Sequence, residues 1–167
     1  MNGQAVIQNF LAQQKNITFG YSELNFLSAD SLEQSQTGYS FDDKGNSLMS
    51  GKPGSWQPGW IVIANDETGD PIFVDTGTPE LQVFTAAHGM AHWEAEPITD
   101  SLHSFADILI QLRLLATGRA NPVEKLLNPL LAREAQDFLK FVRTASPNTD
   151  PAYWETLMLL ALENDTE

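Results

Sequence analysis

Residues 59–75, GWIVIANDETGDPIFVD, contain two β-rich runs on either side of a cluster of turn-forming residues. The first run covers 60–64 and the second covers 71–75. Between them, 65–70 consists of Asn, Asp, Glu, Thr and Gly, which favour turns. This pattern is typical of an antiparallel hairpin, and it predicts that the fold contains an antiparallel sheet.

Further strands are expected on both sides of this hairpin. Residues 81–87 form a third β-rich run, and residues 92–98 alternate apolar and polar side chains as a half-exposed strand does. Residues 20–59 are rich in Ser, Gly, Asn and Asp, and their short apolar islands at 26–27 and 39–41 could be strands or docked turns. We therefore expect a sheet of about four to six strands.

Helical periodicity flanks the predicted sheet. Residues 3–15 carry a narrow apolar stripe, and residues 102–116 repeat apolar side chains at intervals of three and four. Pairs of a capping residue and a proline predict three more helices, beginning at Asn121-Pro122, Asn128-Pro129 and Asp150-Pro151. Because strands and helices are segregated along the chain, the sequence predicts an α+β fold with an N-terminal helix and C-terminal helices.

Length and composition agree with a single folded domain. The chain has 167 residues, of which 42% are hydrophobic, enough for a sizeable core. It has no Cys, which excludes disulfides, Cys-ligated metals and thiol catalysis and fits a reducing compartment. Residues 1–10 carry no secretory signal pattern, and no apolar run reaches the roughly 20 residues of a membrane span, so a cytoplasmic location is expected.

The charge is strongly negative and unevenly distributed. The formal net charge is −13, and residues 1–112 hold three lysines against 14 acids. Carboxylates repel phosphates, so this balance disfavours binding to nucleic acid or to an anionic membrane surface. A basic protein partner is favoured instead.

Neither the histidines nor the acids form a recognisable catalytic or metal-binding motif. His88 and His92 have the spacing of a helical zinc pair, but β-type runs flank them and Gly89 lies between them, which favours a structural role. The hairpin acids do not follow the pattern of an EF-hand loop, and Glu94 and Glu96 share one face of a predicted strand, which alone carries no catalytic signal. We therefore predict no catalytic residue, no cofactor and no metal ligand.

Several tryptophans lie near the acidic hairpin in the sequence. Trp60 begins a strand and is expected in the core. Trp56 lies in a loop rich in Pro and Gly, where a place in the core and a place at an interface are about equally favoured.

The chain resembles the SUKH superfamily of Smi/Knr-type domains from about residue 24 to residue 118. The resemblance is carried by the run Trp56–Ala64, the Gly69-Asp70-Pro71 hairpin with its acidic strand end, Pro79, the strand at Val83, His88-Gly89, Trp93 and the helix Ser104–Leu109. It implies an α+β core at residues 1–118, with residues 119–167 as a C-terminal helical extension packed on the same domain. Members of this family have no established enzymatic activity; bacterial members are widely inferred to be immunity proteins that neutralise toxin domains, and fungal members act as regulatory scaffolds.

Charge and resemblance together predict a non-enzymatic, intracellular protein-binding module, an immunity protein that neutralises a basic toxin domain through an acidic surface. Trp56 would be the anchor of the interface, and charge complementarity would come from Asp66, Glu67, Asp70, Asp75, Glu94 and Glu96. A cytoplasmic regulatory or scaffold protein of Smi/Knr type, docking through its C-terminal helices, is the alternative. A small metal-dependent hydrolase using His88 and His92 is a third and weaker hypothesis.

Overall fold

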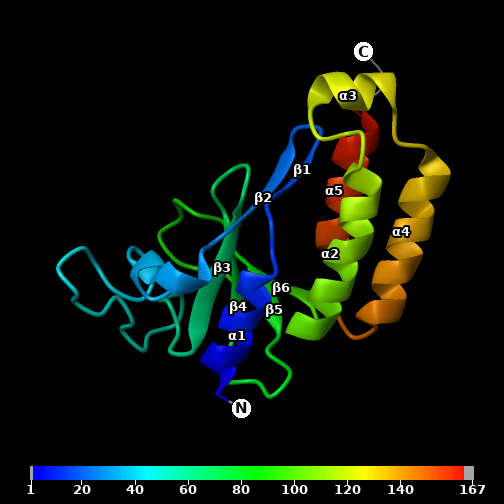
Figure 1. Ribbon diagram of the computed structural model, residues 1–167. Helices are drawn as coiled ribbons and strands as arrows, with labels where there is room; N and C mark the ends of the chain where they lie inside the picture. Colours follow the sequence, from blue (N-terminus) through cyan, green and yellow to red (C-terminus); the bar gives the residue numbers. More distant parts are fainter. Residues whose placement is uncertain (1, 164–167) are drawn as a thin grey trace.

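A six-stranded antiparallel sheet forms the centre of the structure, a computed structural model that describes residues 2–163 (Figure 1). Neighbouring strands in the sequence are neighbours in the sheet, so the chain forms a simple meander. The strands are β1 (Ile17–Phe19), β2 (Ser22–Phe26), β3 (Trp60–Asp66), β4 (Pro71–Asp75), β5 (Val83–Thr85) and β6 (Glu96–Thr99). The predicted α+β fold and the predicted number of strands are confirmed.

Helices occupy both ends of the chain. They are α1 (Gly3–Ala12), α2 (Leu102–Ala116), α3 (Pro122–Leu127), α4 (Ala132–Ala145) and α5 (Ala152–Glu163), with the 3₁₀ turns η1 (Ala29–Ser31) and η2 (Gln34–Gln36) in the long segment before β3. α2, α4 and α5 run alongside one another at one side of the sheet, and α3 crosses one end of this group (Figure 1). Trp154 of α5 and Phe138 of α4 belong to the same buried core as α1 and the sheet.

The two central strands are buried on both faces and separate two apolar clusters. Ile63 and Ile72 point into the main core with the helices, whereas Val62 and Phe73 belong to a smaller cluster with Trp56 and Ala86. This double burial explains why β3 and β4 are continuous apolar runs rather than alternating ones. A bulge between Val62 and Ala64 leaves Ile63 as the extra residue, and both Ile63 and Ala64 face the main core.

Four predicted elements are shorter in the structure. The helix expected to begin at Asn128-Pro129 begins at Ala132, and Asn128 instead ends α3. The first helix ends at Ala12 rather than 15, because the backbone N–H groups of Gln13 and Gln14 bond three residues back and close the last turn. The strand expected at 81–87 covers only Val83–Thr85, and the one expected at 92–98 begins at Glu96. Before β6, the N–H of Trp93 donates to the carbonyl of Gly54 at 2.7 Å. This hydrogen bond attaches the segment to the loop before β3, and the segment is not part of a strand.

A glutamine side chain fastens the long segment before β3 to the sheet. Gln36 is only 6% exposed, and its Oε1 accepts from the N–H of Val62 at 2.8 Å while its Nε2 donates to the Val62 carbonyl at 3.0 Å. The same Nε2 donates to the carbonyl of Leu32 at 3.1 Å. β2 pairs with β3 only at residues 64–66, so it does not reach Val62. The side-chain amide of Gln36 makes the hydrogen bonds to the Val62 backbone that a neighbouring strand would otherwise make.

We predict that Gln36→Ala lowers the free energy of unfolding by about 1–3 kcal/mol, because it leaves the buried N–H and C=O of Val62 without this partner. Gln34→Ala is the matched control: Gln34 lies in the same 3₁₀ turn but is exposed, so its substitution should change stability by about 0.5 kcal/mol or less. Urea denaturation of both variants measures the difference. Equal midpoints for the two would contradict the role of Gln36.

Candidate functional site

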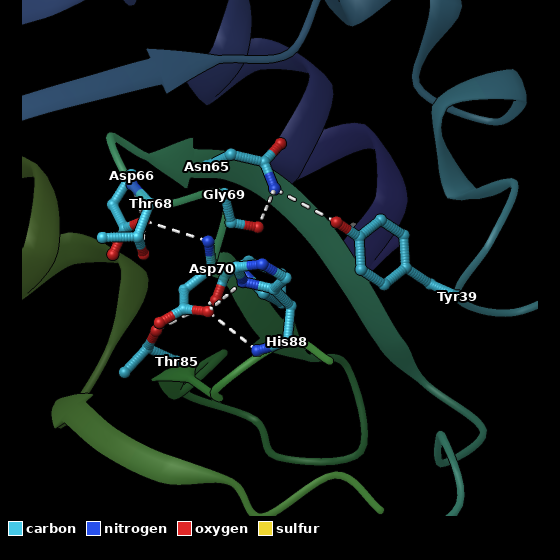
Figure 2. Close-up of polar contacts among 9 residues, drawn as sticks. Tyr39, Asn65, Asp66, Thr68, Gly69, Asp70, Thr85 and His88 are labelled. Carbon is cyan, nitrogen blue, oxygen red and sulfur yellow. Dashed lines mark hydrogen bonds and ion pairs between the residues drawn. The ribbon is translucent and has the colours of Figure 1, made fainter. Parts of the chain in front are cut away.

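The turn between β3 and β4 is organised around one carboxylate. Asp66 Oδ1 accepts hydrogen bonds from the Thr68 N–H at 2.9 Å, the Thr68 hydroxyl at 2.7 Å and the Asp70 N–H at 2.9 Å (Figure 2). Gly69 follows with φ at +91°, a conformation that side chains disfavour. Asp66 is therefore required by the turn itself, which is the common role of Asp in such loops.

A second carboxylate joins this turn to the segment after β5. Asp70 Oδ1 accepts from the backbone N–H of His88 at 2.7 Å and lies 2.6 Å from His88 Nδ1 (Figure 2). Partial burial alone would raise the pKa of Asp70, but the backbone and ring hydrogen bonds of His88 outweigh it and hold that pKa below its ordinary value. On the other side of the turn, Asn65 Nδ2 donates to the Tyr39 hydroxyl at 3.1 Å. The turn is thus held from both sides.

A cavity of about 370 Å³ lies between this end of the sheet and α5. Part of its wall is apolar and comes from β1, β2, α2 and α5: Ile17, Phe19, Leu24, Leu112, Leu157 and Leu160. Five acids also line it: Glu23, Asp66, Glu67, Asp70 and Glu96. Among the described residues that line the cavity, none is Lys, Arg or His.

Strand register explains why acids from distant parts of the sequence gather here. Leu24 pairs with Asp66, so Glu23 lies beside the β3–β4 turn, and the Glu67 side chain accepts from the Glu23 N–H at 3.1 Å. Thr85 pairs with Ile72 on one side and with Glu96 on the other, which brings Glu96 to the same end of the sheet. β2, the β3–β4 turn and β6 therefore bring their carboxylates to the same end of the sheet.

Tyr153 of α5 completes the lining opposite the sheet. Burial of its phenol, and next the negative charges of Asp66, Glu67 and Asp70, raise its pKa well above the ordinary value of 10.0. The phenol therefore stays neutral at physiological pH. It adds a phenol ring and its hydroxyl to a lining that also contains the aromatic ring of Phe19 and the hydroxyl of Ser22.

The structure brings together four of the six acids that the sequence analysis proposed. Asp66, Glu67, Asp70 and Glu96 line the cavity. Asp75 does not, because it pairs with Trp60 at the opposite end of the hairpin, where its Oδ1 accepts from the Gly77 N–H at 2.8 Å. The prediction that Glu94 shares a strand face with Glu96 is wrong, since Glu94 lies in the loop before β6.

The proposed role of Trp56 as an interface anchor also needs correction. Its side chain is 1% exposed and packs in the smaller cluster with Trp60, Phe73 and Trp93, and its Nε1 donates to the Trp60 carbonyl at 3.0 Å. In this fold, Trp56 fills the core instead of presenting a surface. Trp60, expected in the core, is half-buried in the same cluster.

Glu23 and Tyr153 were not found by the sequence analysis. Glu23 lies in a strand of five residues that no clear alternation marked, and Tyr153 reaches the site only through the packing of α5. Tyr153 belonged to a recognised helix, but nothing in that helix says which part of the sheet it faces.

The two histidines proposed for the weaker metal-site hypothesis have separate surroundings. His88 contacts Asp70, whereas His92 Nε2 lies 4.0 Å from Glu94 Oε2 and its Cβ lies close to Gly54. Within residues 2–163, no group of three or more His, Cys, Asp or Glu side chains is arranged to hold a metal ion. The helices in this range are also too short or too polar to cross a membrane.

Comparisons of the chain with models of known protein families, with curated proteins and with solved structures found no match. The resemblance to the SUKH superfamily therefore stays a prediction.

We predict that Asp70 makes stability depend on pH in the acidic range. Its pKa lies below 3.8 in the folded protein, so its contribution to the free energy of unfolding is complete at neutral pH. It is lost as the pH falls from about 5 through 3.8 to the lower native pKa, because protonation removes the charged acceptor. Asp70→Asn should therefore lose less stability than the wild type over this range.

Chemical denaturation at a series of pH values between about 5 and 2.5 measures this difference. Glu94→Gln serves as the control, because it removes one negative charge at an exposed position outside the Asp70–His88 contacts. The same slope for Asp70→Asn and the wild type would contradict the role given to the His88 contacts.

Proposed function

We propose that this protein is a non-enzymatic binding module that holds a basic protein against the acid-lined end of its sheet, and that it acts as an immunity protein against a basic toxin domain. The observation that carries the proposal is the cavity lined by five acids and, among its described lining residues, by no basic side chain. Clustered like charges repel one another, and a cationic partner relieves that repulsion.

The charge of the whole chain acts in the same direction. A net charge of −13 produces a long-range field that attracts a basic protein and raises its association rate. Glu67 and Glu96 are exposed, so they are available to a partner without rearrangement of the fold. Such attraction between exposed charges is screened by salt over about 8–10 Å at physiological ionic strength.

The state of the carboxylates favours binding over acid catalysis. A general acid at neutral pH needs a carboxyl whose pKa is raised, whereas the pKa of Asp70 is lowered. The Asp66 carboxylate is occupied by three hydrogen bonds within its own turn. These two groups hold the turn in shape and add negative charge.

The role as an immunity protein comes from the resemblance to SUKH domains, together with the preference for a basic partner. A cytoplasmic location is part of this proposal, because an immunity protein must meet its toxin inside the cell that it protects. A regulatory protein of Smi/Knr type would also bind a partner. The two roles differ in what the partner does to the cell when it is produced alone.

We predict that Glu67→Gln combined with Glu96→Gln abolishes capture of a basic protein from a native cell lysate at low salt. The double variant removes two charges at the cavity and leaves a carbonyl oxygen that can still accept a hydrogen bond at each position. Glu33→Gln combined with Asp43→Asn is the control, since both residues are exposed, lie outside the cavity lining and change the net charge equally. For the purified partner, the site variant should lower the association rate about tenfold at low salt, and the control much less.

Three results would decide between these hypotheses. Equal binding by the site variant and the control would contradict an acidic interface at the cavity. If the captured protein arrests growth when produced alone and coproduction of the wild-type chain restores growth, the partner is a toxin. A captured partner without toxicity would favour the regulatory alternative.

A further inference from the structure

The cavity at the end of the sheet combines two kinds of surface. Its apolar part includes Leu157 and Leu160 of α5, of which the first is half-buried and the second exposed, together with the buried Leu24 of β2 and Leu112 of α2. Its acidic part comes from the β3–β4 turn and from the strands beside it, with Glu67 and Glu96 exposed. A volume of about 370 Å³ lies near the lower end of the range of about 300–1,000 Å³ found for ligand pockets.

These two surfaces fit a flexible apolar stem that ends in a cation. An inorganic cation would leave the accessible apolar surface of Leu157 and Leu160 in contact with water, and a purely apolar group would leave the carboxylates without a counter-charge. Long basic side chains pack their methylene groups along apolar surface and keep the charged head on polar groups. A second copy of this chain is a poor occupant, since its own charge is also strongly negative.

The arrangement favours arginine over lysine. The carboxylates come from β2, from the β3–β4 turn and from β6, so they approach the cavity from different strands. A guanidinium group has five N–H donors in one plane and can bond to acceptors on more than one side, whereas an ammonium group is a compact point charge. Tyr153 adds an aromatic ring, on which guanidinium groups stack well.

We propose that the cavity receives an arginine side chain of the basic partner protein, with its stem against the leucines and its guanidinium on the carboxylates. This inference rests on the proposed function and specifies how the partner is recognised. It assigns the acids a short-range role in addition to long-range attraction. It also makes α5 part of the interface, because Thr156 and Leu157 line the same cavity.

Capped amino acids test the chemistry of the cavity without the partner. Nα-acetyl-arginine N-methylamide, its lysine analogue and its citrulline analogue are each titrated into the ¹⁵N-labelled full chain and followed by NMR. We expect saturable shifts of the backbone amides of Glu67, Thr68 and Leu157 with arginine in the millimolar range. Lysine should bind more weakly, and the uncharged citrulline at least about tenfold more weakly than arginine.

Two arginine substitutions on α5 separate insertion into the cavity from general charge effects. Thr156→Arg places a cation at an exposed position that lines the cavity, and Leu159→Arg places the same charge at an exposed position of the same helix that does not line it. Thr156→Arg should abolish binding of the arginine probe and weaken binding of the partner at least about tenfold more than Leu159→Arg does. Circular dichroism of both variants checks that each is folded.

The results distinguish a failure of this inference from a failure of the proposed function. Equal effects of the two arginine variants, or equal binding of the citrulline and arginine probes, would overturn arginine insertion. If the two arginine variants bind the partner equally and the arginine probe does not bind, but the Glu67→Gln and Glu96→Gln double variant still loses the partner, the acidic interface stands without arginine insertion. If the arginine probe binds but no basic protein is captured, the proposed function fails and, with it, the assignment to a partner's side chain.

Discussion

Burial of β3 on both faces is the constraint on which the rest of the structure depends. One face of β3 contributes to the main core, and the other contributes Val62 to the smaller cluster. α1 and the C-terminal helices supply the main core, so the smaller cluster needs another cover. The long segment before β3 and the loop before β6 supply it through Tyr39, Trp56 and Trp93. In Figure 1, the former segment lies on the side of β3 away from the helices. Gln36 supplies backbone-like hydrogen bonds at the point where β2 no longer reaches.

The same arrangement determines where a site can form. Because each strand pairs with its neighbour in sequence, the turns and strand ends lie at the two ends of the sheet. The end that contains the β3–β4 turn lies opposite α5, and the cavity lies between them. Its residues come from positions 17 to 160 of the chain. The main core holds α5 in place through Trp154, which is fully buried and whose Nε1 donates to the Ile98 carbonyl at 2.9 Å. The position of Tyr153, next to Trp154, is therefore determined by packing on β6.

Local sequence signals predicted what local interactions determine. The hairpin at 60–75 and the helix at 102–116 were predicted because β-branched runs, turn formers and three-four periodicity act within short windows. The fastening of Gln36 to Val62 spans 26 residues, and no short window contains it. Site residues divide in the same way. Asp66, Glu67 and Asp70 lie in one turn and were found together, whereas Glu23 and Tyr153 meet them only through strand pairing and helix packing. Trp56 was ambiguous because its loop has no periodicity, and only the second core shows that it is buried.

The acids of the cavity are not equivalent, and the difference shows which ones the fold does not require. Asp66 and Asp70 accept several hydrogen bonds that shape the turn and attach it to His88, so their negative charge accompanies a structural role. Glu67 accepts one bond from the exposed Glu23 N–H, which a glutamine could also accept. Glu96 is the exposed first residue of β6 and pairs with Thr85 through its position in the strand, which does not require a carboxylate. Like charges at one edge oppose folding through mutual repulsion. A fold that needed only the turn could carry neutral residues at Glu67 and Glu96, so these two positions are where the proposed binding of a basic partner can be tested without loss of the turn.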